Sequence, residues 1–142
     1  MQQRLERQTF YRLQPALIQA LRAVGKTTEE SGLGRPLVEL VKIRASQING
    51  CAFCVNMHSV DARNLGEAQE RLDLLPVWRE APCFTARERA ALAWTEALTL
   101  VADDEVADDV YAEAAEAFGE EGLAHLTAAI IVINSWNRIA VG

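Results

Sequence analysis

The chain has 142 residues, half of them apolar, and its 20 acidic and 14 basic residues give a net charge of −6. This length suits one domain with a hydrophobic core and is too short for two, so we expect a single domain over residues 1–142. An acidic chain without a clustered basic surface is not expected to bind nucleic acid or anionic lipid. A polar N-terminus and apolar runs well below the ~18 residues of a membrane span predict a cytoplasmic protein outside the membrane.

Apolar residues at helical spacing predict three helices in the first half of the chain. The first includes Leu13 to Val24 and ends at a break that begins with Gly25. The second starts near Pro36 and ends at Asn49-Gly50. The third, from Cys51 to about Leu65, is apolar on two sides and is therefore expected to be mostly buried.

Three more helices are expected in the second half. Thr85 to Glu88 has the form of a capping box and opens a helix through about Val101. A shorter helix covers about Asp108 to Phe118, and Gly119 and Gly122 bracket the turn before a last helix, Leu123 to about Val141. No set of segments alternates with a period of two between hairpin turns. The sequence therefore predicts an all-α fold of about six helices.

Cys51, Cys54 and His58 share one face of the third helix, because residues three, four and seven apart lie one above another. The two cysteines are close enough to form a disulfide, and the positive end of the helix stabilises a thiolate at Cys51. His58 can serve Cys54 as a base or charge partner. Such a set predicts a dithiol peroxidase or oxidoreductase, in which one thiolate attacks and the second thiol resolves the sulfenic acid.

Other interpretations of the cysteine pair stay open. A CxxC motif with a nearby histidine is also half of a zinc site, but only Cys83 or His125 could complete it, so we expect neither a metal nor a cofactor. The pair is also compatible with two inert core residues, or with a redox sensor whose disulfide changes the protein surface with little turnover. Cys83 has no partner nearby in the sequence and is interpreted as structural.

Several polar side chains in apolar helices require partners. Glu39 lies away from the apolar arc of its helix, so periodicity alone favours a solvated carboxylate. Arg44 falls inside that arc and must find a carboxylate, a carbonyl or a subunit interface. Asn134, Asn137 and Arg138 pose the same question in the last helix.

From about Pro15 to Arg138 the chain resembles the carboxymuconolactone decarboxylase superfamily, and within it the single-domain alkyl hydroperoxidase D-like proteins. The residues that carry the resemblance are Glu39-Leu40-Val41, Ser46 to Cys51, Cys54, His58, and Ile133 to Ile139. The resemblance implies that family's all-helical fold and a homo-oligomer, as a dimer, trimer or hexamer. It also implies a relay of Glu39, Cys51, Cys54 and His58, in which Cys54 attacks the peroxide, Cys51 resolves, and Glu39 and His58 arrange the proton transfer.

The implied activity is the reduction of alkyl hydroperoxides, with the disulfide reopened by an external dithiol or by a thioredoxin-like or lipoylated protein. One departure concerns Phe53, because peroxidases of the family often carry a second histidine immediately before the later cysteine. This difference bears on efficiency and substrate rather than on the redox chemistry. The cysteine pair disfavours lactone decarboxylation, because decarboxylases of the superfamily usually lack it.

Overall fold

The computed structural model describes residues 2–142 and confirms the all-α fold, since that part of the chain forms helices and no strands. Its helices, in chain order, are α1 (Arg7–Leu13), α2 (Pro15–Glu29), α3 (Arg35–Ile48), α4 (Ala52–Asn64), α5 (Gln69–Leu74), the 3₁₀ helix η1 (Leu75–Val77), α6 (Ala86–Thr99) and α7 (Asp108–Val141).

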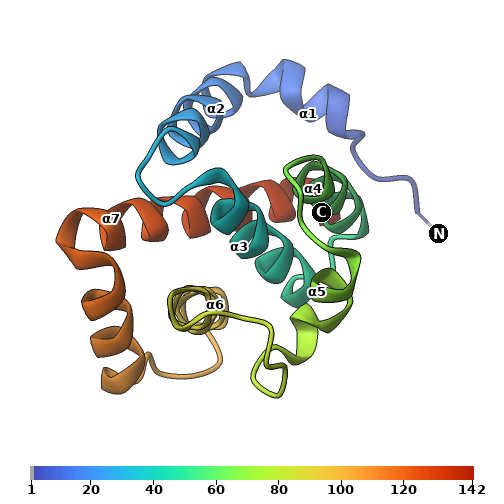
Figure 1. Ribbon diagram of the computed structural model, residues 1–142. Helices are drawn as coiled ribbons and strands as arrows, with labels where there is room; N and C mark the ends of the chain where they lie inside the picture. Colours follow the sequence, from blue (N-terminus) through green and yellow to red (C-terminus); the bar gives the residue numbers. More distant parts are fainter. Residues whose placement is uncertain (1) are drawn as a thin grey trace.

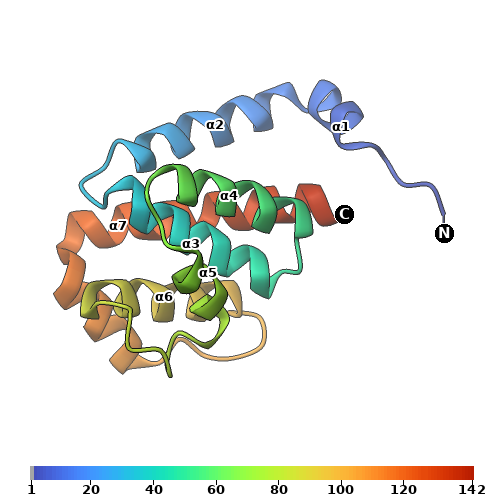
Figure 2. The same ribbon diagram turned by 45° about the vertical axis from the view of Figure 1, so that its right-hand side comes forward.

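Helix α3 lies at the centre of the molecule and packs against α4, α6 and α7. Helices α1 and α2 lie on one side of this centre, next to α4 and the C-terminal half of α7, and α6 lies on the other side with the first half of α7 (Figures 1 and 2). Because α3 has neighbours on every side, nine of its residues are buried, polar ones included. Its polar side chains must therefore find partners inside the protein.

Two apolar clusters hold α3 in place. One joins α3 to α5, η1 and α6 and includes Leu40, Leu75 and Leu92, all fully buried. The other joins α3 to α6 and α7 and includes Val41 and Leu126. Burial of each such side chain contributes about 1.5–3 kcal/mol, so these clusters keep α3 rigid.

Glycines shape two of the helices differently from the prediction. Helix α2 continues past Gly25 to Glu29, where the sequence predicted a break, and a Cβ at Gly25 would make only an ordinary contact, 3.9 Å from a methyl group of Val132. The two helices expected in the last third are one interrupted helix, α7, with a kink at Gly119, where φ is 68°. The prediction of a turn that extends to Gly122 is wrong, because one glycine in a left-handed conformation redirects the chain without a loop.

Among residues 2–142, none of the helices combines the length and the apolarity that crossing a bilayer requires. The cytoplasmic location, the single domain over residues 1–142 and the homo-oligomer stay predictions.

Candidate functional site

The cysteine pair lies at the start of α4. Gly50, with φ at 69°, makes the tight turn out of α3, and Cys51 follows as the N-cap residue of α4. The prediction placed Cys51 inside the first turn, whereas its backbone is extended and its Sγ accepts a hydrogen bond from the Cys54 N–H at 3.2 Å. A side-chain acceptor at this position satisfies one of the free N–H groups of the helix. The predicted closeness of the two cysteines is confirmed, because they form a disulfide.

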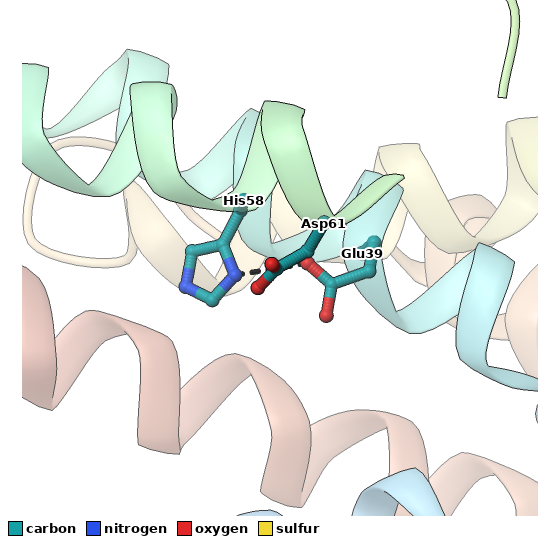
Figure 3. A group of neighbouring side chains, drawn as sticks. All are labelled: Glu39, His58 and Asp61. Atoms are coloured by element: carbon teal, nitrogen blue, oxygen red, sulfur yellow. Dashed lines mark hydrogen bonds and ion pairs between the residues drawn. The ribbon is translucent and has the colours of Figure 1, made fainter. Parts of the chain in front are cut away.

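Glu39 of α3 contacts His58 of α4, which lies one helical turn after Cys54. The Nδ1 atom of His58 lies 2.9 Å from Oε2 of Glu39, and both side chains are buried (Figure 3). A carboxylate can only accept, so Nδ1 donates, and in the neutral ring Nε2 is left as the free acceptor on the far side from Glu39. This arrangement is the one by which an acid residue orients a catalytic base.

The position of Glu39 corrects the prediction from periodicity. Its residue is only 3% exposed, although its helical position suggested a solvated carboxylate. The prediction assumed a helix with one buried face, whereas α4 and α7 cover the face of α3 that would otherwise meet water. The structure brings Glu39 beside His58, and the role that the family resemblance implies for Glu39 stays a prediction.

Lys42 gives the buried carboxylate a second partner. Its Nζ lies 3.6 Å from Oε1 of Glu39 and 3.2 Å from Oε1 of Glu29 on α2. Burial by itself would raise the pKa of Glu39, but the hydrogen bond from His58 and the charges of Lys42 and His58 outweigh it, and the pKa is lowered. Glu39 is therefore ionised at neutral pH and can stabilise a protonated His58.

A ladder of amides ties the turn between α3 and α4 to α7. The Asn49 Nδ2 donates to the side-chain oxygens of Asn134 and Asn137, both at 2.9 Å, and Asn137 donates to the Ser46 hydroxyl at 2.9 Å. These bonds fix the residues that lead into Cys51. The asparagines of the last helix are thus positioning residues for the cysteine pair.

Arg44 and Cys83 have structural roles. Arg44 finds the carboxylate that its place in an apolar arc required, with Nε 3.3 Å from Glu96, which confirms that prediction. Arg138, the remaining polar residue in question, is exposed and donates to the Asn134 carbonyl one turn back. Cys83 is a free, half-buried thiol that packs against the first apolar cluster.

The two cysteines line different hollows of the surface. Cys54 and His58 line a cleft of about 500 Å³ between α1, α2, α4 and α7. Cys51 lines a separate, open groove of about 490 Å³, formed by the end of α3 and the outer side of α4, with Asn56 and Ser59 among its residues. Both cysteines are themselves buried, with 2% of each residue exposed, so Cys54 lies in the wall of the cleft and Cys51 in the wall of the groove.

Helix α4 is less buried than its two apolar stripes predicted. Cys54, His58 and Ala62 of one stripe are buried, whereas Phe53 and Met57 of the other stripe are 50% and 39% exposed. Both exposed residues line the cleft. Phe53 and Met57 thus form part of the wall of the cleft instead of packing in the core.

Asp61 joins Glu39 and His58 in a group whose oxygen and nitrogen atoms lie within 4.8 Å of one another (Figure 3). Carboxylate and imidazole groups are possible metal ligands. Here, however, Nδ1 of His58 and both oxygens of Glu39 are already bonded, to each other and to Lys42. The group suits proton transfer better than metal binding. Sequence reasoning missed Asp61 and Lys42, although each lies three residues from a predicted site residue on the same helix.

The chain is similar in sequence to known proteins. Residues 12–97 match the model of the carboxymuconolactone decarboxylase family. The uncharacterized protein YdfG of Bacillus subtilis (strain 168) is 39% identical over 136 residues, which cover 96% of this chain and 92% of YdfG. The uncharacterized protein YnjA of Escherichia coli (strain K12) is 33% identical over 91 residues, or 64% of this chain and 50% of YnjA.

A solved structure has the same fold. It is the crystal structure of a protein of unknown function from Agrobacterium tumefaciens, proposed to be the antioxidant defence protein AhpD. The two structures agree with a TM-score of 0.88 and 41% sequence identity, over 94% of this chain and 91% of the other. The matches in sequence and in structure together show that the chain belongs to the carboxymuconolactone decarboxylase family.

Proposed function

We propose that this protein is a thiol-dependent peroxidase that reduces organic hydroperoxides. The main support is one juxtaposition: Cys54 lines an apolar cleft together with His58, and a buried, ionised Glu39 holds the imidazole. A cysteine beside a base that is itself oriented by a third group matches the pattern of an activated nucleophile. The resemblance of the fold to a protein proposed to be AhpD supports the same chemistry.

In the proposed reaction, Nε2 of His58 accepts the proton of the Cys54 thiol. The thiolate attacks the terminal oxygen of the hydroperoxide and the O–O bond breaks, so that the alkoxide takes a proton from the imidazolium and leaves as an alcohol. Cys54 is then a sulfenic acid. The Cys51 thiol attacks the Cys54 sulfur and closes the disulfide, the state seen in the structure, and its proton leaves with the hydroxyl group of the sulfenic acid as water. In balance, one hydroperoxide and two thiols give one alcohol, one water and one disulfide.

Regeneration requires an external dithiol, and the groove on the Cys51 side suits its approach. A thiolate that enters this groove attacks the Cys51 sulfur and releases the Cys54 thiolate beside His58. The second thiol of the reductant then displaces Cys51 and leaves as a disulfide. We propose a small dithiol, or a thioredoxin-like or lipoylated protein, as this donor.

The test compares wild type with Cys54→Ser and Cys51→Ser after one equivalent of cumene hydroperoxide. Mass spectrometry should show the loss of two mass units in the reduced wild type, mapped to a disulfide between Cys51 and Cys54. A sulfenic acid should be trapped in Cys51→Ser and not in Cys54→Ser. Sulfenic acid in Cys54→Ser alone would instead identify Cys51 as the attacking residue.

Turnover separates an enzyme from a redox sensor. With dithiothreitol or dihydrolipoamide in excess, a peroxidase consumes many equivalents of hydroperoxide per chain. If consumption of hydroperoxide stops at one equivalent per chain while the disulfide can still be reduced, the peroxidase function is refuted and the redox sensor remains.

A further inference from the structure

Two guanidinium groups in the cleft have no carboxylate partner. Arg7 of α1 and Arg22 of α2 both line the cleft, and neither forms an ion pair within residues 2–142. Arg7 instead stacks on the ring of Phe53, with 3.8 Å between its Cζ and the ring centre, and Arg22 lies 6.0 Å from the ring centre of Tyr11. Neither contact uses the N–H groups at the edge of the guanidinium, so these groups are free to donate.

The other cations of the cleft have carboxylate partners within the protein. Lys42 is paired with Glu29 and Glu39, and Nζ of Lys26 lies 3.9 Å from Oε1 of Glu30. The remaining acidic group, Asp61, lies with Glu39 and His58. In a chain with a net charge of −6, the cleft thus carries unpaired positive charge on the side formed by α1 and the first half of α2.

The rest of the lining is apolar. Phe53 and Met57 of α4 line the cleft and are 50% and 39% exposed, and Val132, Ile133 and Trp136 of α7 also line it. The ring of Trp136 packs at a tilt against that of Tyr11, with their ring centres 6.0 Å apart, which continues the apolar wall up to the arginines. A hollow with apolar walls and a few convergent polar groups is the usual form of a small-molecule site.

We propose that the cleft binds an amphipathic carboxylate, with its hydrocarbon chain along Phe53, Met57 and Trp136 and its carboxylate on Arg7 and Arg22. The planar fork of arginine matches the two oxygens of a carboxylate. Combined with the proposed function, on which this step rests, the substrate is the hydroperoxide of an acyl-chain carboxylic acid. Its reduction consumes the two thiols of Cys51 and Cys54 and yields the hydroxy acid, water and the disulfide.

Binding can be tested without turnover. Isothermal titration calorimetry of the oxidised full chain compares octanoate with 1-octanol, which shares the chain and lacks the charge. Wild type should bind octanoate more tightly than octanol. The double variant Arg7→Gln/Arg22→Gln should have about tenfold lower affinity for octanoate and an unchanged affinity for octanol. Arg12→Gln, an exposed arginine of α1 outside the cleft, should leave both affinities unchanged.

A lysine variant tests whether the loss of affinity in the glutamine double variant results only from unfolding of α1. Arg7→Lys/Arg22→Lys keeps the charges and should recover part of the affinity for octanoate. Equal affinities of wild type for octanoate and octanol, or the same loss in Arg12→Gln as in the glutamine double variant, would overturn the proposal.

Kinetics link the site to the reaction. The rate at which a hydroperoxy-octanoic acid oxidises the reduced protein should exceed that of its methyl ester, and this ratio should fall about tenfold in Arg7→Gln/Arg22→Gln. If the protein binds octanoate but consumes neither hydroperoxide, the peroxidase function is refuted and the carboxylate site is not. If the protein consumes both hydroperoxides at equal rates and does not bind octanoate, the carboxylate site is refuted and the peroxidase function is not.

Discussion

Replacement of Glu39 by glutamine tests how the buried carboxylate contributes to the reaction. Glutamine has nearly the same shape, and its side-chain oxygen can still accept the hydrogen bond from Nδ1 of His58. The ring therefore keeps its orientation and its free Nε2, and only the negative charge is removed. The variant separates the electrostatic role of Glu39 from its role in positioning His58.

The size of the effect follows from the 2.9 Å contact between two buried side chains. A hydrogen bond to a charged group contributes about 1.5–3 kcal/mol, against about 0.5–1.5 kcal/mol for a neutral one. Loss of the charge thus costs the protonated form of His58 about 1–2 kcal/mol. Since each 1.36 kcal/mol changes a rate about tenfold, oxidation of Cys54 should slow roughly 5- to 30-fold.

The assay is a single turnover of reduced protein at pH 7. Samples mixed with excess cumene hydroperoxide are quenched with N-ethylmaleimide, and the remaining thiols are counted by mass spectrometry to give a second-order rate constant. Glu67→Gln is the matched control, because Glu67 is also a mostly buried carboxylate, paired with Arg71 at 2.7 Å, and does not line the cleft. A wild-type rate in Glu39→Gln, or an equal loss in Glu67→Gln, would refute the role of the charge.

Three further predictions follow from the same structure. Glu96 accepts from Trp78, Arg79 and Arg44, so Glu96→Gln should lose about 2 kcal/mol of unfolding free energy and roughly 5–10 °C in Tm, measured by thermal circular dichroism. The pKa of Glu39 is lower in the folded state, so its stabilisation is present above the unfolded value of 4.5 and is lost as the pH falls through the folded value. In urea unfolding, the stability difference between wild type and Glu39→Gln should therefore narrow from pH 6 to pH 3, and a constant difference would contradict this assignment. Ser59→Arg, in the groove beside Cys51, should slow reduction of the disulfide by dihydrolipoamide several-fold without slowing peroxide oxidation, and equal effects on both steps would contradict two-sided access.

The arrangement of Cys51, Cys54 and His58 could be predicted because it depends on helical spacing within one short segment. Helix boundaries were less accurate: a shift of one residue turned Cys51 from a first-turn residue into the N-cap. The capping box at Thr85 was predicted fully, since all of its bonds lie within four residues. Local patterns were thus reliable guides to local structure.

Features that depend on tertiary packing could not be derived in this way. The burial of Glu39 results from the helices that surround α3, and periodicity within α3 contains no information about them. The exposure of Phe53 results from the separation between α4 and its neighbours across the cleft. The unpaired Arg7 is informative only because α1, which the sequence analysis did not identify, places it over the site.

Lys42 has a consequence for how the cleft and the relay influence each other. Its ammonium group is shared between Glu29, in the wall formed by α2, and Glu39, which orients His58. An outward displacement of α2 would take Glu29 away and leave the whole charge of Lys42 to Glu39, which would then hold His58 less strongly. The α2 wall of the cleft and the carboxylate that orients His58 are therefore joined through one buried cation, so a change in the position of α2 would also change the surroundings of Glu39.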